Sequence, residues 1–150
     1  MPAGTAARFA AIVLTALALV PTGAHFFELP NKIGLDADRY FVVQGIYRGW
    51  ALFGIVLISA VVANLVAAVG LRGQRGPFRL ALAACLLMAA TLGIFFAWTF
   101  PANQATANWT IAPENWQALR TQWEFSHACN AVLTFLALCA ATLAGLTAKS

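Results

Sequence analysis

GWALFGIVLISAVVANLVAAVGL, residues 49–71, contains no charged side chain and few polar ones. A run this long and this apolar is typical of a helix that crosses a bilayer, which needs about 20 residues. Three further blocks also lack charge: residues 9–24, 80–100 and 128–148. Because lipid offers the backbone no hydrogen-bond partner, each block is predicted to be a helix.

The composition supports the same fold class. Apolar residues make up 61% of the chain and charged residues only 9%, against about 45–50% and 25% in soluble domains. This leaves too little polar surface for a water-soluble globule. We therefore predict an all-α integral membrane protein, a single up-down bundle of four transmembrane helices over residues 1–150. The spans are expected at about 7–28, 47–71, 79–100 and 113–148, and the fourth helix should extend beyond the lipid and project on the outer side.

The basic residues indicate the topology. Arg72, Arg75 and Arg79 lie together in the short link between spans two and three, and Arg8 and Lys149 lie near the termini. By the positive-inside rule, both termini are predicted to be cytoplasmic in a multi-pass protein of the inner (cytoplasmic) membrane. All the acidic residues fall on the opposite side: Glu28, Asp36, Asp38, Glu114 and Glu124. The net charge of +4 thus reports orientation, and no nucleic-acid partner is predicted.

The cysteines argue against thiol–disulfide chemistry. Cys85, Cys129 and Cys139 all fall within predicted spans, and the sequence contains no C-x-x-C. An enzyme that exchanges disulfides needs a pair of nearby cysteines. Small buried apolar side chains are therefore the simpler interpretation of all three residues.

The two histidines of the chain are candidates for chemistry. His25 precedes Glu28 by three residues and His127 follows Glu124 by three, so each pair shares a helix face. If the first and fourth helices are neighbours, the four side chains form one ring. Glu-x-x-His elements on facing helices are a way for bundles to hold metals, so these four residues are candidate metal ligands. Two separate interfacial pairs are the alternative interpretation.

The outer part of the fourth helix carries a second pattern. Trp116, Arg120, Trp123, His127 and Asn130 recur at spacings of four and three residues, which places them on one stripe of the helix. A Trp-Arg-Trp stack is suited to an aromatic or anionic ligand through stacking and cation–π contacts. An aromatic belt at the level of the lipid headgroups is the alternative interpretation of the tryptophans.

Together these motifs resemble the signature of the anthrone oxygenase-like family, a large group of small four-span membrane proteins known mostly as a domain of unknown function. The residues that carry the resemblance are Pro101-Ala-Asn103, Trp116, Arg120, Trp123-Glu124 and His127. The segments Gly23-Ala-His25-Phe-Phe-Glu28-Leu-Pro30-Asn31-Lys32 and Tyr47-Arg48-Gly-Trp50 resemble a bacterial subgroup. The resemblance implies oxidation of an anthrone to an anthraquinone with molecular oxygen and without a conventional cofactor. Asn130 stands where many members carry a basic residue.

The resulting functional hypothesis is a membrane oxygenase-like protein that oxidises a phenolic or polycyclic aromatic substrate at the extracytoplasmic mouth of the bundle. His127 would be a general base oriented by Glu124, and Arg120 and Asn103 would stabilise an oxyanion. Substrate binding is assigned to Trp116, Trp123, Tyr47 and Arg48. His25 and Glu28 would complete the site or, with Glu124 and His127, ligate a metal.

Two alternatives remain open at this stage. The first is a redox protein in which His25 and His127 ligate a haem or a copper or iron ion. The second is a non-catalytic accessory subunit whose polar ring holds the helices together. The expected partners are the lipid bilayer and a small hydrophobic aromatic ligand, whereas the sequence predicts no particular oligomeric state.

Overall fold

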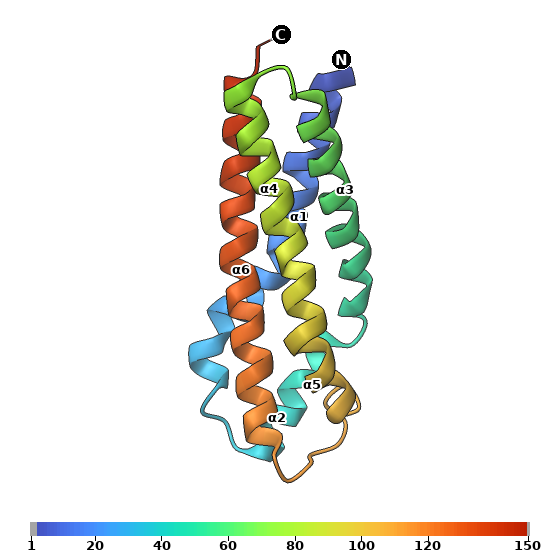
Figure 1. The fold of residues 1–150 in the computed structure, drawn as a ribbon. Coiled ribbons are helices and arrows are strands. Elements are labelled where there is room, and N and C mark those ends of the chain that lie inside the picture. Colours follow the sequence, from blue (N-terminus) through green and yellow to red (C-terminus); the bar gives the residue numbers. More distant parts are fainter. Residues whose placement is uncertain (1–2, 150) are drawn as a thin grey trace.

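Four long helical segments pack side by side in the computed structural model, which describes residues 3–149 (Figure 1). The segments that are long and apolar enough to cross a membrane are Ala3–Lys32, Trp50–Gly70, Arg75–Ala105 and Trp116–Thr147. Successive segments run in opposite directions, and the two termini lie at the same end of the bundle (Figure 1). The prediction of an all-α membrane bundle is confirmed at this level.

The long segments are built from shorter elements. The α-helices are α1 (Ala3–Lys32), α2 (Ala37–Gln44), α3 (Phe53–Gly70), α4 (Arg75–Ile94), α5 (Phe100–Ala105) and α6 (Trp116–Thr147). Two short 3-10 helices, η1 (Gly45–Tyr47) and η2 (Trp50–Leu52), lie between α2 and α3, and a π-helical turn, η3 (Phe95–Thr99), joins α4 to α5.

Small side chains hold the middle of the bundle together. Helix α1 packs against α3 and α6, and α4 packs against the same two helices. Helices in lipid approach each other closely where the side chains at their interface are small, and polar side chains there can form hydrogen bonds between helices. Asn64 of α3 donates such a bond to the Thr15 hydroxyl of α1 at 2.8 Å. The buried core cluster consists of Ala18, Ala60, Ala84, Met88, Ala137 and Ala141. The large apolar side chains face outward instead, where lipid would cover them.

Helix α1 runs further than the sequence predicts. It was expected to end near residue 28 because proline disfavours helical angles in the residue before it. Instead it continues through Pro30 to Lys32. Proline removes one backbone hydrogen bond, and the following turn re-forms at once, since the Ile33 amide donates to the Leu29 carbonyl at 3.0 Å. The extra turn brings Lys32 onto the same face as Glu28.

The segment before the second span forms a separate helix, and the span itself begins at Trp50 rather than at about residue 47. Helix α2 starts at an Asp36 cap whose side chain accepts from the Arg39 amide at 2.9 Å. The chain then reverses at Gly49, whose φ of +89° lies in the left-handed region that favours glycine. This turn lets α2 fold back over the outer end of the bundle.

The third span continues past its expected end at residue 100, because a π-helical turn accommodates Pro101. Proline has no amide hydrogen for the helix ladder. The Phe100 amide accordingly bonds to the Phe95 carbonyl, and the Trp98 carbonyl accepts from the Gln122 side chain of α6 at 2.8 Å. Residues 101–105 are therefore helical, which places Asn103 opposite α6.

A left-handed turn follows α5. Ala107, Asn108 and Trp109 have φ values of 45°, 57° and 63°, each costing about 1–2 kcal/mol for a residue other than glycine. The Asn108 amide donates to the Asn103 carbonyl at 2.7 Å, which helps to hold the turn. Backbone strain of this kind clusters at functional sites. In this protein, the left-handed turn places the buried Trp109 indole beside the outer turns of α6.

Helix α6 begins at Trp116 rather than at Pro113, which lies outside it. The sequence suggested that its outer turns project beyond the bundle without neighbours, but they do not. They pack against α2 and the 106–111 turn in an aromatic cluster, and Figure 1 shows α2 and α5 beside them. The buried members of this cluster are Tyr40, Ala102, Trp109 and Trp123.

Candidate functional site

The two histidines meet at the end of the bundle opposite the termini. The imidazoles of His25 on α1 and His127 on α6 have ring centroids 4.1 Å apart, at an interplanar angle of 34°. His25 is 5% exposed, and the Trp123 ring packs against both imidazoles. The convergence of the two rings, expected from their matched positions on neighbouring helices, is thus confirmed.

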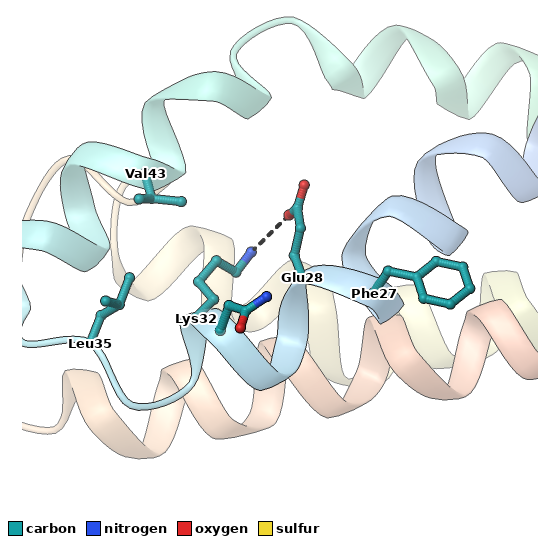
Figure 2. A pocket seen from close by; sticks show the side chains of 6 residues that line it. Phe27, Glu28, Lys32, Leu35 and Val43 are labelled. Carbon is teal, nitrogen blue, oxygen red and sulfur yellow. Dashed lines mark ion pairs between the residues drawn. The ribbon is translucent and has the colours of Figure 1, made fainter.

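A buried lysine lies at the centre of the predicted ring of histidines and glutamates. Lys32 is 2% exposed, and its Nζ is 3.1 Å from Glu124 Oε1 and 3.7 Å from Glu28 Oε2. The Glu124 side chain is fully buried. An isolated buried charge is very costly, so the Lys32 ammonium and the Glu124 carboxylate compensate each other, whereas the Glu28 side chain is 36% exposed. Figure 2 shows the contact between Lys32 and Glu28.

Two tyrosines complete this charged network. The Tyr40 hydroxyl donates to Glu124 Oε1 at 2.8 Å and accepts from the Gln44 amide. The Tyr47 hydroxyl accepts from Lys32 Nζ at 2.6 Å and donates to Glu28 Oε2. Burial is the main cause that raises the pKa of both tyrosines above the usual value, and the neighbouring carboxylates raise it further. Both phenols therefore stay protonated and act as donors to the carboxylates.

Asn103 fixes the tryptophans beside the histidines. Its Oδ1 accepts from Trp123 Nε1 at 2.8 Å and from Trp109 Nε1 at 3.1 Å. The Trp123 ring also lies under the ammonium of Lys32, 4.9 Å from its centroid. The amide oxygen of Asn103 thus sets the orientation of the ring on which both the histidines and the lysine pack.

Arg120 spans the outer edge of the site. Its Nη1 donates to the Leu35 carbonyl at 2.6 Å, and its guanidinium lies 4.7 Å from the Trp116 ring centroid and 5.4 Å from that of Tyr40. The Arg120–Trp116 half of the expected stack is therefore present. Over Trp123 the cation is Lys32 rather than Arg120.

Two other predicted site residues lie differently from their assigned roles. Arg48 is exposed and is therefore not part of the buried network. Glu124 was expected to orient His127, but its hydrogen bonds within the described chain go to Tyr40 and Lys32 and not to His127. The cause is the extra turn of α1, which brings an ammonium to this carboxylate.

Several buried polar atoms at this end of the bundle have no hydrogen-bond partner among residues 3–149. They are His25 Nδ1, His127 Nδ1, Gln44 Oε1, Glu124 Oε2, Asn130 Oδ1 and Arg120 Nε. Most buried polar atoms in proteins are paired, so a cluster of unpaired ones needs an explanation. The amide and carboxylate oxygens in this set are acceptors, so the cluster is suited to a ligand that donates hydrogen bonds.

The donor set fits a metal or haem poorly. Across the described residues, no group of three or more His, Cys, Asp or Glu side chains is arranged to hold a metal ion. The Lys32 ammonium stands between the carboxylates where a cation would bind. A haem held by two histidines needs one imidazole on each face of the macrocycle, whereas these rings pack 4.1 Å apart.

Sequence reasoning missed Lys32, Tyr40 and Gln44. Lys32 follows Glu28 by four residues, a spacing that signals a shared helix face once the helix is allowed through Pro30. Tyr40 and Gln44 share the same spacing, but no local signal shows that their helix folds back onto α6.

No family model, curated protein or solved structure matches this chain.

Proposed function

We propose that this protein is a membrane oxygenase that oxidises a phenolic or polycyclic aromatic substrate at the end of the bundle that carries His25 and His127. The observation that carries the proposal is the pair of packed imidazoles, each with a buried Nδ1 that has no partner among the described residues. A histidine kept only for structure normally has its ring nitrogens satisfied. Here each imidazole retains a nitrogen for a ligand.

The surroundings suit an aromatic substrate. The rings of Trp123, Tyr47 and Trp50 enclose His25 at centroid distances of 4.9, 4.4 and 5.5 Å. Aromatic walls with a small number of convergent polar groups are the usual make-up of a small-molecule site. Acceptor oxygens without partners, such as Glu124 Oε2, complement the hydroxyl groups of a phenol.

The proposed reaction converts an activated CH₂ group between aryl rings into a ketone, with O₂ as the oxidant. His127 removes a proton from the carbon, and the single negative charge of the resulting carbanion is delocalised over the aryl rings and their oxygen substituent. O₂ accepts the electrons and forms a C–O bond, so that protonation gives a hydroperoxide. Loss of water from the hydroperoxide leaves C=O, and the balance is CH₂ + O₂ → C=O + H₂O. A positioned general base contributes typically 10²–10⁴-fold to such a step.

The chain supplies charge stabilisation from two cations. Lys32 Nζ already binds a phenol oxygen, that of Tyr47, and Arg120 lies over the aromatic rings of Trp116 and Tyr40. Fixed positive groups in a water-poor site stabilise developing negative charge more strongly than water does. Asn103 acts here as a positioning residue through Trp123 rather than as an oxyanion donor.

The site is proposed to face the extracytoplasmic side of the inner membrane. The link between α3 and α4, which carries Arg72, lies at the same end as both termini (Figure 1). His25 and His127 belong to the parts of α1 and α6 toward the other end. Basic links are retained on the cytoplasmic side. A substrate would then reach the histidines from the outer leaflet or from the periplasmic space.

Oxygen uptake tests the proposal. Purified protein in nanodiscs is mixed with anthrone, and O₂ consumption is followed together with the anthraquinone absorption band. Turnover is expected in the wild type and in Cys129→Ala, an exposed position on α6, and loss of about 10²-fold or more in His127→Ala. Uptake no faster than in empty nanodiscs, across anthrone and hydroxylated anthrones, would overturn the proposal. Turnover that follows added iron or copper would favour the metal alternative.

A further inference from the structure

A groove opens beside the charged network, between the last turns of α1 and helix α2. It has a volume of about 290 Å³ and is lined by Phe27, Glu28, Asn31, Lys32, Leu35 and Val43. Figure 2 shows Glu28 and Lys32 reaching toward each other, with Leu35 and Val43 on one side of the pair and Phe27 on the other. The groove therefore has apolar walls and one charged pair.

The charged pair already binds a phenol from within the chain. The Tyr47 hydroxyl accepts from Lys32 Nζ at 2.6 Å and donates to Glu28 Oε2. A hydroxyl that receives one hydrogen bond from an ammonium and gives one to a carboxylate uses both of its functions in charge-assisted bonds. Both residues also line the groove, where the Glu28 side chain is 36% exposed, so its carboxylate can accept from a second aromatic hydroxyl.

We propose that this groove binds a phenolic ligand, with the aromatic ring between Leu35 and Val43 and the hydroxyl donating to the Glu28 carboxylate, which Lys32 holds in place. The inference rests on the proposed function, because it names the hydroxyl group by which the substrate is recognised. The volume is in keeping with this ligand class, since a cavity of about 150 Å³ suffices for benzene and ligand pockets begin at about 300 Å³. One or two fused rings would fit, so a three-ring substrate such as anthrone would extend beyond the groove.

Charge balance at the groove favours a neutral phenol over an anion. Lys32 is the only cation among the six lining residues, and it is paired with both Glu28 and Glu124. A phosphate or carboxylate would lie against Glu28 and meet its repulsion. A phenol instead donates to that carboxylate, so Glu28 discriminates between the two classes.

Neighbouring valines on α2 provide a matched test of the groove. Val43 lines it, whereas Val42 is 78% exposed and does not. Binding of 1-naphthol to the purified protein in nanodiscs is measured by quenching of tryptophan fluorescence. Val43→Trp should weaken binding at least tenfold by filling the groove, and Val42→Trp should leave the Kd unchanged. Equal binding by both variants would overturn the proposal.

The hydroxyl contact is tested separately with 1-methoxynaphthalene, which cannot donate a hydrogen bond. The wild type should bind it at least tenfold more weakly than 1-naphthol, and Glu28→Gln should narrow that difference. Equal affinity of the wild type for the two ligands would overturn the proposal. Because these are binding measurements, failure of the oxygenase reaction would leave a 1-naphthol site intact. Conversely, anthrone turnover that Val43→Trp leaves unchanged would place the substrate elsewhere while the oxygenase proposal stands.

Discussion

His25 and His127 lie 102 residues apart in the chain numbering, yet their imidazoles pack at a centroid distance of 4.1 Å. Each ring is within reach of the same ligand, so the two histidines are expected to act as one unit. In anthrone turnover, His127→Ala and His25→Ala should each reduce kcat by about 10²-fold or more. Groups that act as a unit are strongly non-additive, so the double variant should be no slower than the slower single variant.

The measurement is a double-mutant cycle on O₂ uptake, with thermal melting of each variant to correct for the folded fraction. Additive losses in kcat would show that the histidines work independently. Losses that vanish after correction for the folded fraction would assign both residues a structural role.

Lys32 is expected to stabilise the fold through its contact with Glu124. Lys32→Met leaves a carboxylate that is fully buried without its cation, and removing one partner of a buried pair costs about 3–5 kcal/mol. Adding Glu124→Gln to Lys32→Met should recover much of the loss, since the charge left behind is then gone. Thermal unfolding in nanodiscs, followed by circular dichroism, measures both effects.

The exposed pair Asp36–Arg39 is the control for the lysine variants. The two side chains are 61% and 76% exposed, and exposed ion pairs contribute little. Arg39→Met should therefore melt at the wild-type temperature. A Lys32→Met protein that melts there too would show that Glu124 does not depend on the ammonium.

The sequence predicted the bundle because hydropathy is a local property. Each of the four spans has an apolar run that needs no tertiary information, and the histidine–glutamate spacing was enough to bring His25 and His127 together. The helix ends were less predictable. Pro30 and Pro101 were expected to stop helices, but a proline costs a helix few bonds, and neighbouring groups compensate them.

The identity of the charged centre could not be read from the sequence. Tyr40 reaches Glu124 only because α2, which precedes the Gly49 turn, folds back over the outer end of the bundle, and this is a tertiary relationship between segments 84 residues apart. Glu124 bonds to Tyr40 and Lys32 rather than orienting His127, because α2 brings the phenol and the extra turn of α1 brings the ammonium. Spacing along one helix shows which residues share a face, but it does not show which side chain of another helix each of them binds.

Asn103 is predicted to hold the tryptophans in place. Asn103→Ala removes the acceptor of two indole N–H groups, which at about 1 kcal/mol for each hydrogen bond should lower the free energy of unfolding by about 2 kcal/mol. Asn103→Asp keeps an oxygen at this position and should lose less. The neighbouring Gln104 is exposed, so Gln104→Ala is the control. A red shift of tryptophan emission in Asn103→Ala alone would report the released indoles, and identical melting of all three variants would contradict the assignment.

The orientation of the bundle is testable with single cysteines at its two ends. Asp38 lies near the start of α2, at the histidine end, and Gly73 lies in the arginine-containing link at the other end; both are exposed. The native Cys85, Cys129 and Cys139 are first replaced by alanine, which suits their places in apolar helices. In intact cells, a membrane-impermeant maleimide should label Asp38→Cys and leave Gly73→Cys unlabelled, because the basic link is held on the cytoplasmic side. Permeabilised cells should label both, which controls for a buried thiol at Gly73.

Labelling of Gly73→Cys in intact cells, with protection of Asp38→Cys, would invert the topology. The histidine site would then open to the cytoplasm, and its substrate would have to come from inside the cell.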